Sequence, residues 1–196
     1  MPTAQLIDDT SLAMTTLLQS FLLVLASEMG DKTQLLALVL ALRFRAPWTI
    51  MAGILVATLL NHGLASVAGG MLSAYFAEET LKWILAITFF IFAGWILIPD
   101  KSEDLKHEDK YGAFLTTVVV FFLAEMGDKT QLATLALGAK FTNALLVTIG
   151  TTMGMLVADG LVVFFGEKLT QKIHMKWIRV FAACLFALFG LGILFR

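Results

Sequence analysis

The octapeptide Glu-Met-Gly-Asp-Lys-Thr-Gln-Leu occurs twice in this chain, at residues 28–35 and 125–132. Each copy lies within a long apolar stretch and combines two acids, one base and two neutral side chains that carry oxygen. Carboxylate, hydroxyl and amide oxygens are hard ligands, which suit Mn²⁺, Ca²⁺ or Mg²⁺. Ionisable groups in an apolar span are costly unless they face the protein interior or a wet cavity, and so they mark an ion path. The repeated octapeptide therefore predicts a site for a hard divalent cation.

The candidate metal ligands are the oxygen-bearing side chains of both octapeptides. They are Glu28, Asp31, Thr33, Gln34, Glu125, Asp128, Thr130 and Gln131. The four carboxylates and the two lysines of the motifs carry a formal charge of −2, so one divalent cation would neutralise the cluster. Protons could do the same when the metal leaves, because crowded carboxylates repel one another and favour protonation. The chemistry is therefore compatible with a metal–proton exchanger.

The spacing within each octapeptide also permits a simpler interpretation. On a continuous helix, Glu28 and Asp31 would project from one face, and Lys32 would lie one turn after Glu28. The glutamate and the lysine could then be an intrahelical ion pair that only neutralises a packed bundle. That interpretation leaves the aspartate of each copy without a counter-charge in a low-dielectric environment.

A second pair of polar positions shares the spacing of the octapeptides. Asn61 and His62 correspond to Ala158 and Asp159, so one half has a histidine where the other has a carboxylate. His62 could bind metal, relay protons or make a hydrogen-bonded contact between helices. Asp159 could join the metal cluster or carry the proton. The auxiliary or proton-coupling candidates are Asp159, His62, Asn61, Lys32 and Lys129.

The rest of the chain is apolar enough to place these motifs in a membrane. Hydrophobic residues make up 59% of the 196 residues, and the net charge of −1 shows no bias toward a nucleic-acid partner. The one cysteine, Cys184, excludes an intrachain disulfide. A helix that spans the hydrocarbon takes about 20 mostly apolar residues. The apolar runs predict an all-α membrane protein with six transmembrane helices, at approximately 14–41, 48–74, 81–98, 113–138, 143–166 and 175–195.

The octapeptides belong to a duplication that covers the whole chain. The spacing that relates them also pairs Gly53 with Gly150 and Gly63 with Gly160. The expected units are a three-helix repeat at 1–99, a charged linker at 100–112 and a second three-helix repeat at 113–196. An odd number of spans per repeat makes the second copy enter the membrane from the opposite side, as in many secondary transporters. This symmetry would bring the motifs face to face near the midplane and would allow alternating access.

The basic residues of the loops predict the orientation. Nine Lys and Arg residues lie on the side of the central linker, and three lie on the side of the two termini. Basic residues are retained on the cytoplasmic side. We therefore expect a cytoplasmic linker and both termini outside.

The residues Glu28 to Thr33 and Glu125 to Thr130 resemble the paired E-x-G-D-[KR]-[ST] signature of the Gdt-type family of cation–proton exchangers. That family includes bacterial manganese exporters and Golgi manganese/calcium transporters. The similarity spans the chain, and neither motif departs from the signature. The resemblance implies export of Mn²⁺, with Ca²⁺ as a further cation, in exchange for protons. It also implies that the acids Glu28, Asp31, Glu125 and Asp128 are the ligands.

The compact length is typical of a bacterial member of the family, which predicts the cytoplasmic membrane as the location. We expect no cofactor; the transported Mn²⁺ or Ca²⁺ and the protons are substrates, and the lipid bilayer is the other partner. The sequence does not indicate an oligomeric state. A passive divalent-cation channel and an exporter of small cationic solutes, such as amino acids, remain open alternatives. An enzyme is not expected, because no nucleophile–base constellation or metalloprotease motif is present. A purely structural membrane subunit has no positive support either.

Overall fold

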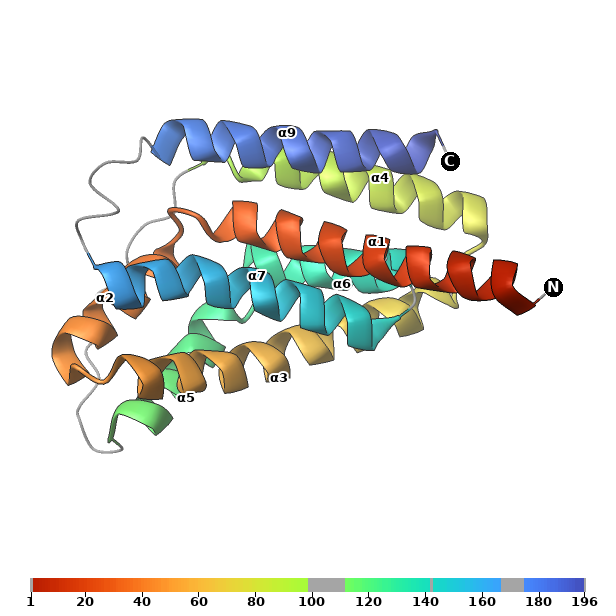
Figure 1. Cartoon of the computed structure of the whole chain (residues 1–196). Coiled ribbons are helices and arrows are strands. Elements are labelled where there is room, and N and C mark those ends of the chain that lie inside the picture. Colours follow the sequence, from red (N-terminus) through yellow and green to blue (C-terminus); the bar gives the residue numbers. More distant parts are fainter. Residues whose placement is uncertain (1, 99–111, 142, 167–174, 196) are drawn as a thin grey trace.

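The computed structural model of the chain describes residues 2–98, 112–141, 143–166 and 175–195, and every regular element in these ranges is an α-helix. The helices surround the two motif turns as one bundle (Figure 1). They are α1 (Pro2–Glu28), α2 (Lys32–Phe44), α3 (Pro47–Ser73), α4 (Glu78–Trp95), α5 (Gly112–Glu125), α6 (Lys129–Phe141), α7 (Ala144–Phe165) and α9 (Met175–Leu194).

Four of the predicted helices agree with the structure to within a few residues. The ranges 48–74, 81–98, 143–166 and 175–195 correspond to α3, α4, α7 and α9. Residues at the N-termini of α3 and α7 explain where these two helices begin. Pro47 occupies the first turn of α3, where its missing N–H costs nothing. Asn143 precedes α7, and its side-chain oxygen accepts a hydrogen bond from Leu146 N–H at 3.1 Å.

The other two predicted helices, 14–41 and 113–138, are each broken at the motif, so the expectation of continuous helices was wrong. The first half-helix ends at the motif glutamate, and the next begins at the motif lysine. The glycine between them has a left-handed backbone, with φ of 83° at Gly30 and 78° at Gly127. A glycine adopts this conformation without a Cβ clash, and it ends a helix. The consequence is a short turn in the middle of each long segment.

The two turns have the same backbone hydrogen bond. Asp31 N–H donates to the carbonyl of Glu28 at 3.1 Å, and Asp128 N–H donates to the carbonyl of Glu125 at 3.1 Å. Glu28 and Asp31 therefore do not share a helical face, because one ends α1 and the other precedes α2. The helical spacing argument for an ion pair between Glu28 and Lys32 fails for the same reason.

The exterior of the bundle suits a bilayer. Within the described ranges, three helical segments are long and apolar enough to cross a membrane: Thr10–Glu28, Pro47–Ser73 and Ala144–Phe165. Gly112–Glu125 and Arg179–Leu194 are shorter apolar helices. Large apolar side chains such as Leu64, Met71 and Ile91 are exposed on the outer surface. A surface of this kind would favour aggregation in water but is the ordinary surface of a helix in lipid.

The packing follows the duplication. Helix α1 packs on α7 as α5 packs on α3, while α3 packs on α7 and α4 packs on α9. A Cβ at Gly150 would lie 2.8 Å from Ser20 Cβ, and a Cβ at Gly53 would lie 2.7 Å from Thr117 Cβ. Gly150 and Ser20 occupy the positions in one pairing that Gly53 and Thr117 occupy in the other. Small residues at these places let the helix backbones come close.

Helices α4 and α9 form a pair at one edge of the bundle (Figure 1). Aromatic side chains hold them together: the ring of Phe89 lies 4.8 Å from that of Phe189 and 6.0 Å from that of Phe186. Edge-to-face and tilted arrangements of this kind suit the quadrupoles of the rings. The pair lies against α1 and α6.

Both ends of the chain lie at the same end of the bundle, which we call the terminal end (Figure 1). The opposite end, where α4 ends and α5 begins, is called the linker end. The predicted linker at 100–112 lies outside the described residues except for Gly112, which begins α5. The basic residues within 99–111 and 167–174 also lie outside the described part of the chain.

The two ends of the bundle are packed differently. At the terminal end, α3 and α6 meet at a seam of small residues formed by Ser66, Gly69, Gly138 and Ala139. A Cβ at Gly138 would lie 2.7 Å from Ser66 Cα, so backbone meets backbone there. At the linker end, the counterpart of Ala139 is Leu42, which is 66% exposed, whereas Ala139 is 2% exposed. The bundle is therefore tight at the terminal end and looser at the linker end.

Candidate metal centre

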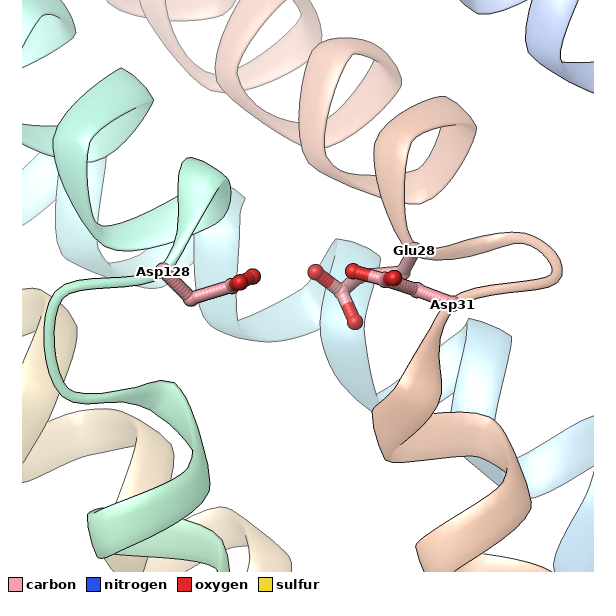
Figure 2. A group of neighbouring side chains, drawn as sticks. All are labelled: Glu28, Asp31 and Asp128. Atoms are coloured by element: carbon pink, nitrogen blue, oxygen red, sulfur yellow. The ribbon is translucent and has the colours of Figure 1, made fainter. Parts of the chain in front are cut away.

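Three carboxylates meet where the two motif turns face each other (Figure 2). Glu28 and Asp31 come from the first motif, and Asp128 comes from the second. Each offers a ligand atom within 4.8 Å of the others, and the residues are only 0%, 6% and 6% exposed. Within the described ranges this is the one group of acids and histidines close enough to hold a metal ion. Glu125, the fourth predicted acid, is not part of it.

The Glu28 carboxylate accepts hydrogen bonds from both motifs. Thr33 Oγ1 donates to Oε2 at 2.7 Å, and Thr130 Oγ1 donates to Oε1. Both predicted threonines are therefore in the site, where they orient the glutamate, and their hydroxyl lone pairs remain available as oxygen donors. Because Thr130 belongs to the second repeat, Glu28 joins the two halves directly.

The motif lysines have partners that helical spacing did not predict. Lys32 Nζ lies 3.1 Å from Asp128 Oδ1, so the ion pair crosses from the first repeat to the second. Lys129 is 7% exposed, and its ammonium lies 5.9 Å from the centre of the Trp95 ring. The Lys129 charge also attracts Glu28. A lysine from each motif thus partly offsets the negative charge of the centre.

The motif glutamines lie at the turns, where the oxygen and the nitrogen of each side-chain amide make hydrogen bonds. The Gln34 side-chain oxygen accepts from Gly30 N–H at 2.7 Å, and the Gln131 oxygen accepts from Gly127 N–H at 2.6 Å. Their amide nitrogens donate to the opposite repeat. The predicted glutamine ligands therefore lie next to the carboxylates, with each carbonyl oxygen bound to backbone.

Two further acids and one histidine are buried in the described part of the bundle without belonging to this group. Glu125, Asp159 and His62 are 1%, 0% and 0% exposed. Among the described residues, neither side-chain oxygen of either acid and neither ring nitrogen of the histidine has a hydrogen-bond partner. Glu125 is close enough to Glu28 and Asp159 to repel both. Burying an ionised carboxylate without a hydrogen-bond partner costs several kcal/mol of free energy. These acids therefore need either a nearby cation or a bound proton.

A small polar hollow lies beside Asp31. Its volume is about 10 Å³, which is room for about one water molecule. The lining includes Lys129 and also Ile98 and Arg179, which lie toward the linker-end termini of α4 and α9. The sequence argument did not single out Arg179 for the site. The last helices of the two repeats align at a spacing of 94 residues, which pairs Lys82-Trp83-Ile84 with Lys176-Trp177-Ile178. At this spacing the counterpart of Arg179 is the apolar Leu85, which was the available signal.

A comparison with known protein families matches the model of the "Divalent cation/proton antiporter GDT1" at residues 16–104 and 113–196. These ranges cover nearly the whole chain and contain both motifs. The chain belongs to the GDT1 divalent cation/proton antiporter family. It is therefore a membrane transporter of divalent cations and not an enzyme, and the resemblance seen in the sequence is confirmed.

Individual relatives within and beyond bacteria agree with this assignment. A Vibrio cholerae protein named "Putative manganese exporter" is 44% identical over 187 residues, which are 95% of this chain and 94% of that protein. The GDT1-like protein 3 of Arabidopsis thaliana is 28% identical, over 90% of this chain and 69% of its own length. The GDT1-like protein sll0615 of Synechocystis is 26% identical, over 90% of this chain and 95% of its own length. No solved structure matches this chain.

Proposed function

We propose that this transporter exports Mn²⁺ from the cytoplasm in exchange for protons, with Ca²⁺ as a second cation that the same oxygen ligands accept. The observation that carries the proposal is the cluster of Glu28, Asp31 and Asp128, which draws buried carboxylates from both repeats. A relative movement of the repeats would make or break such a site, as alternating access requires. The name of the Vibrio cholerae relative supports manganese as the substrate.

The proposed architecture is a pair of inverted repeats with six spans, the first and fourth broken at the motifs. The reciprocal packing of α1 on α7 and of α5 on α3 supports this symmetry. Broken helices near mid-membrane are common in transporters, where the freed backbone groups and helix ends line the substrate site. The proposed location is the bacterial cytoplasmic membrane, with both termini outside, as the distribution of basic residues predicts.

We assign metal and protons to different acids. Glu28, Asp31 and Asp128 hold the metal, because among the described acids only these three offer ligand atoms within one ion's reach. Glu125 and Asp159 carry the protons, because they are buried, lack hydrogen-bond partners in the described structure and lie within repulsive range of Glu28. A cation at the first group lowers the cost of ionising the second, so the two binding events are coupled.

The packing of the two ends suggests how the centre is reached. The α3–α6 seam closes the terminal end, while the hollow beside Asp31 lies toward the linker end. With the linker in the cytoplasm, this conformation presents the site to the cytoplasm, from which Mn²⁺ would load.

Flux through purified protein in liposomes tests the proposal. With an imposed pH gradient, the wild type should move Mn²⁺ against its concentration gradient, and collapse of the pH gradient should stop this movement. Asp31→Asn and Asp128→Asn should each lower the flux by about 100-fold, because each removes a charged ligand from a buried site. Glu79→Gln, at an exposed position of α4, is the matched control and should retain flux.

Other outcomes of this assay would contradict the proposal. Metal flux that is indifferent to the pH gradient would indicate a channel. Absence of Mn²⁺ and Ca²⁺ flux, together with inhibition of transport by lysine or arginine, would indicate an exporter of cationic solutes.

A further inference from the structure

The two motif glutamines make the same pair of contacts in both repeats. Each side-chain oxygen accepts a hydrogen bond from the N–H of the left-handed motif glycine, four residues earlier. Each amide nitrogen reaches the long helix of the opposite repeat. Gln34 Nε2 donates to the carbonyl of Ala158 on α7 at 2.7 Å, and Gln131 Nε2 donates to Asn61 Oδ1 on α3. Ala158 and Asn61 occupy equivalent positions of the duplication.

Asn61 makes a further contact that Ala158 has no side chain to make. Its Nδ2 donates to the carbonyl of Phe122 at 3.3 Å, near the end of α5. In a continuous helix, that carbonyl would accept from the N–H of Met126, but here Met126 N–H bonds to Leu123 at 3.3 Å. Asn61 therefore ties α3 to the end of α5 and, through Gln131, to the start of α6.

We propose that Gln34 and Gln131 are positioning residues that fix each metal-binding turn against the long helix of the opposite repeat. The contact between Gln131 and Asn61, which we call the amide latch, places Asp128 for metal binding. The next residue on each partner helix is one of the buried groups, His62 after Asn61 and Asp159 after Ala158. The latch thus links the motif turn that carries Asp128 to the segment of α3 that carries His62. This inference rests on the proposed function and refines the roles of its residues.

The alternative is that the glutamine carbonyl oxygens bind the metal directly. The contacts favour positioning, because each amide is held at its oxygen by the motif glycine and at its nitrogen by the opposite repeat, which leaves one oxygen lone pair free at most. The two roles differ in what a carboxylate at position 131 does, because a carboxylate is a stronger ligand for a hard cation than an amide but cannot donate a hydrogen bond to Asn61.

A double-mutant cycle in the full-length protein tests the latch, with Mn²⁺ affinity measured by calorimetry and KM measured in liposomes. Asn61→Ala and Gln131→Leu should each weaken Mn²⁺ binding by about tenfold, as loss of a group that orients a ligand commonly does. The double variant should lose less affinity than the sum of the two single losses, because both changes remove the contact between Gln131 and Asn61. Asn61→Ala combined with Gln34→Leu should give additive losses, because the cross-repeat partner of Gln34 is Ala158 and not Asn61. Gln131→Glu should also weaken binding, because it loses the donor to Asn61.

Three results would overturn the inference. One is wild-type affinity in Asn61→Ala, and another is additive losses for Asn61→Ala with Gln131→Leu. The third is wild-type or tighter binding in Gln131→Glu, which would identify position 131 as a metal ligand.

Amide hydrogen exchange at Gly127, measured without metal, separates the latch from the transport function. Asn61→Ala should accelerate exchange of the Gly127 amide by about tenfold if Gln131 loses its anchor, since exchange follows the free energy of local opening. This readout holds even if the wild type neither binds nor moves Mn²⁺ or Ca²⁺, a result that would refute the proposed function alone. Unchanged exchange at Gly127 would overturn the latch itself.

Discussion

Glu28→Gln should lower the affinity for Mn²⁺ by at least about 100-fold, while the equivalent change Glu125→Gln should lower it by less than about tenfold. The two glutamates occupy the same position of the duplicated motif, and each ends a half-helix. Only Glu28 lies within reach of Asp31 and Asp128, so only its loss removes a charged ligand from the proposed metal site. Glutamine retains the size of the side chain and can still bond to both threonine hydroxyls, which should preserve the fold.

Calorimetry with purified protein measures the affinities, and proteoliposome flux separates binding from coupling. We expect Glu125→Gln to bind Mn²⁺ but to lose the ability of a pH gradient to drive uphill movement, because it removes a proposed proton carrier. Asp159→Asn should behave in the same way. Equal losses of affinity in Glu28→Gln and Glu125→Gln would contradict the separate assignment of metal and protons.

Gly138→Ala should reduce the rate of Mn²⁺ exchange by about tenfold or more while leaving Mn²⁺ binding within about twofold of the wild type. A Cβ at this position would collide with the backbone of Ser66, so α3 and α6 must separate at the terminal end. Overpacking of a tight contact costs about 1–3 kcal/mol. That cost disfavours the conformation closed at the terminal end by about 5- to 150-fold. Exchange by alternating access requires this closure once in every cycle.

Gly94→Ala is the matched control, because it is the same substitution in a helix and its Cβ would meet nothing within 4 Å. Gly69→Ala, on the other side of the seam, should reproduce the defect of Gly138→Ala. Flux in liposomes measures the rate, and size-exclusion chromatography in detergent checks the fold. If Gly138→Ala exchanged Mn²⁺ as fast as Gly94→Ala, the seam would have no role as a gate.

Much of this arrangement could be predicted from the sequence. The eight identical residues of the two motifs indicated a duplication, and their oxygen-rich chemistry indicated a hard cation. Four helices were placed correctly, because apolar runs and start signals such as Pro47 and Asn143 are local properties. Membership of the cation/proton antiporter family was also visible in the motifs and is confirmed by the family match.

The motif turns were missed because the local pattern is ambiguous there. A single glycine in an apolar run is tolerated in a helix, and the composition on both sides of Gly30 is that of a membrane span. What ends the helix is the left-handed backbone of the glycine together with the side chain of Gln34, which bonds back to the Gly30 N–H. That bond is accompanied by the contact of Gln34 with Ala158, more than a hundred residues away.

The sequence by itself determined the duplicated motif, four of the helices, the preference for a hard cation and the family. Only the tertiary structure decided that Glu28, Asp31 and Asp128 gather while Glu125 does not, that Lys32 pairs with Asp128, and that the terminal end is the tight one. Hydrophobic periodicity records which face of a helix is buried. The distance between side chains of two repeats depends on how the packed helices are placed, and small residues such as Gly69 and Gly138 set that placement through backbone contacts that no local pattern encodes.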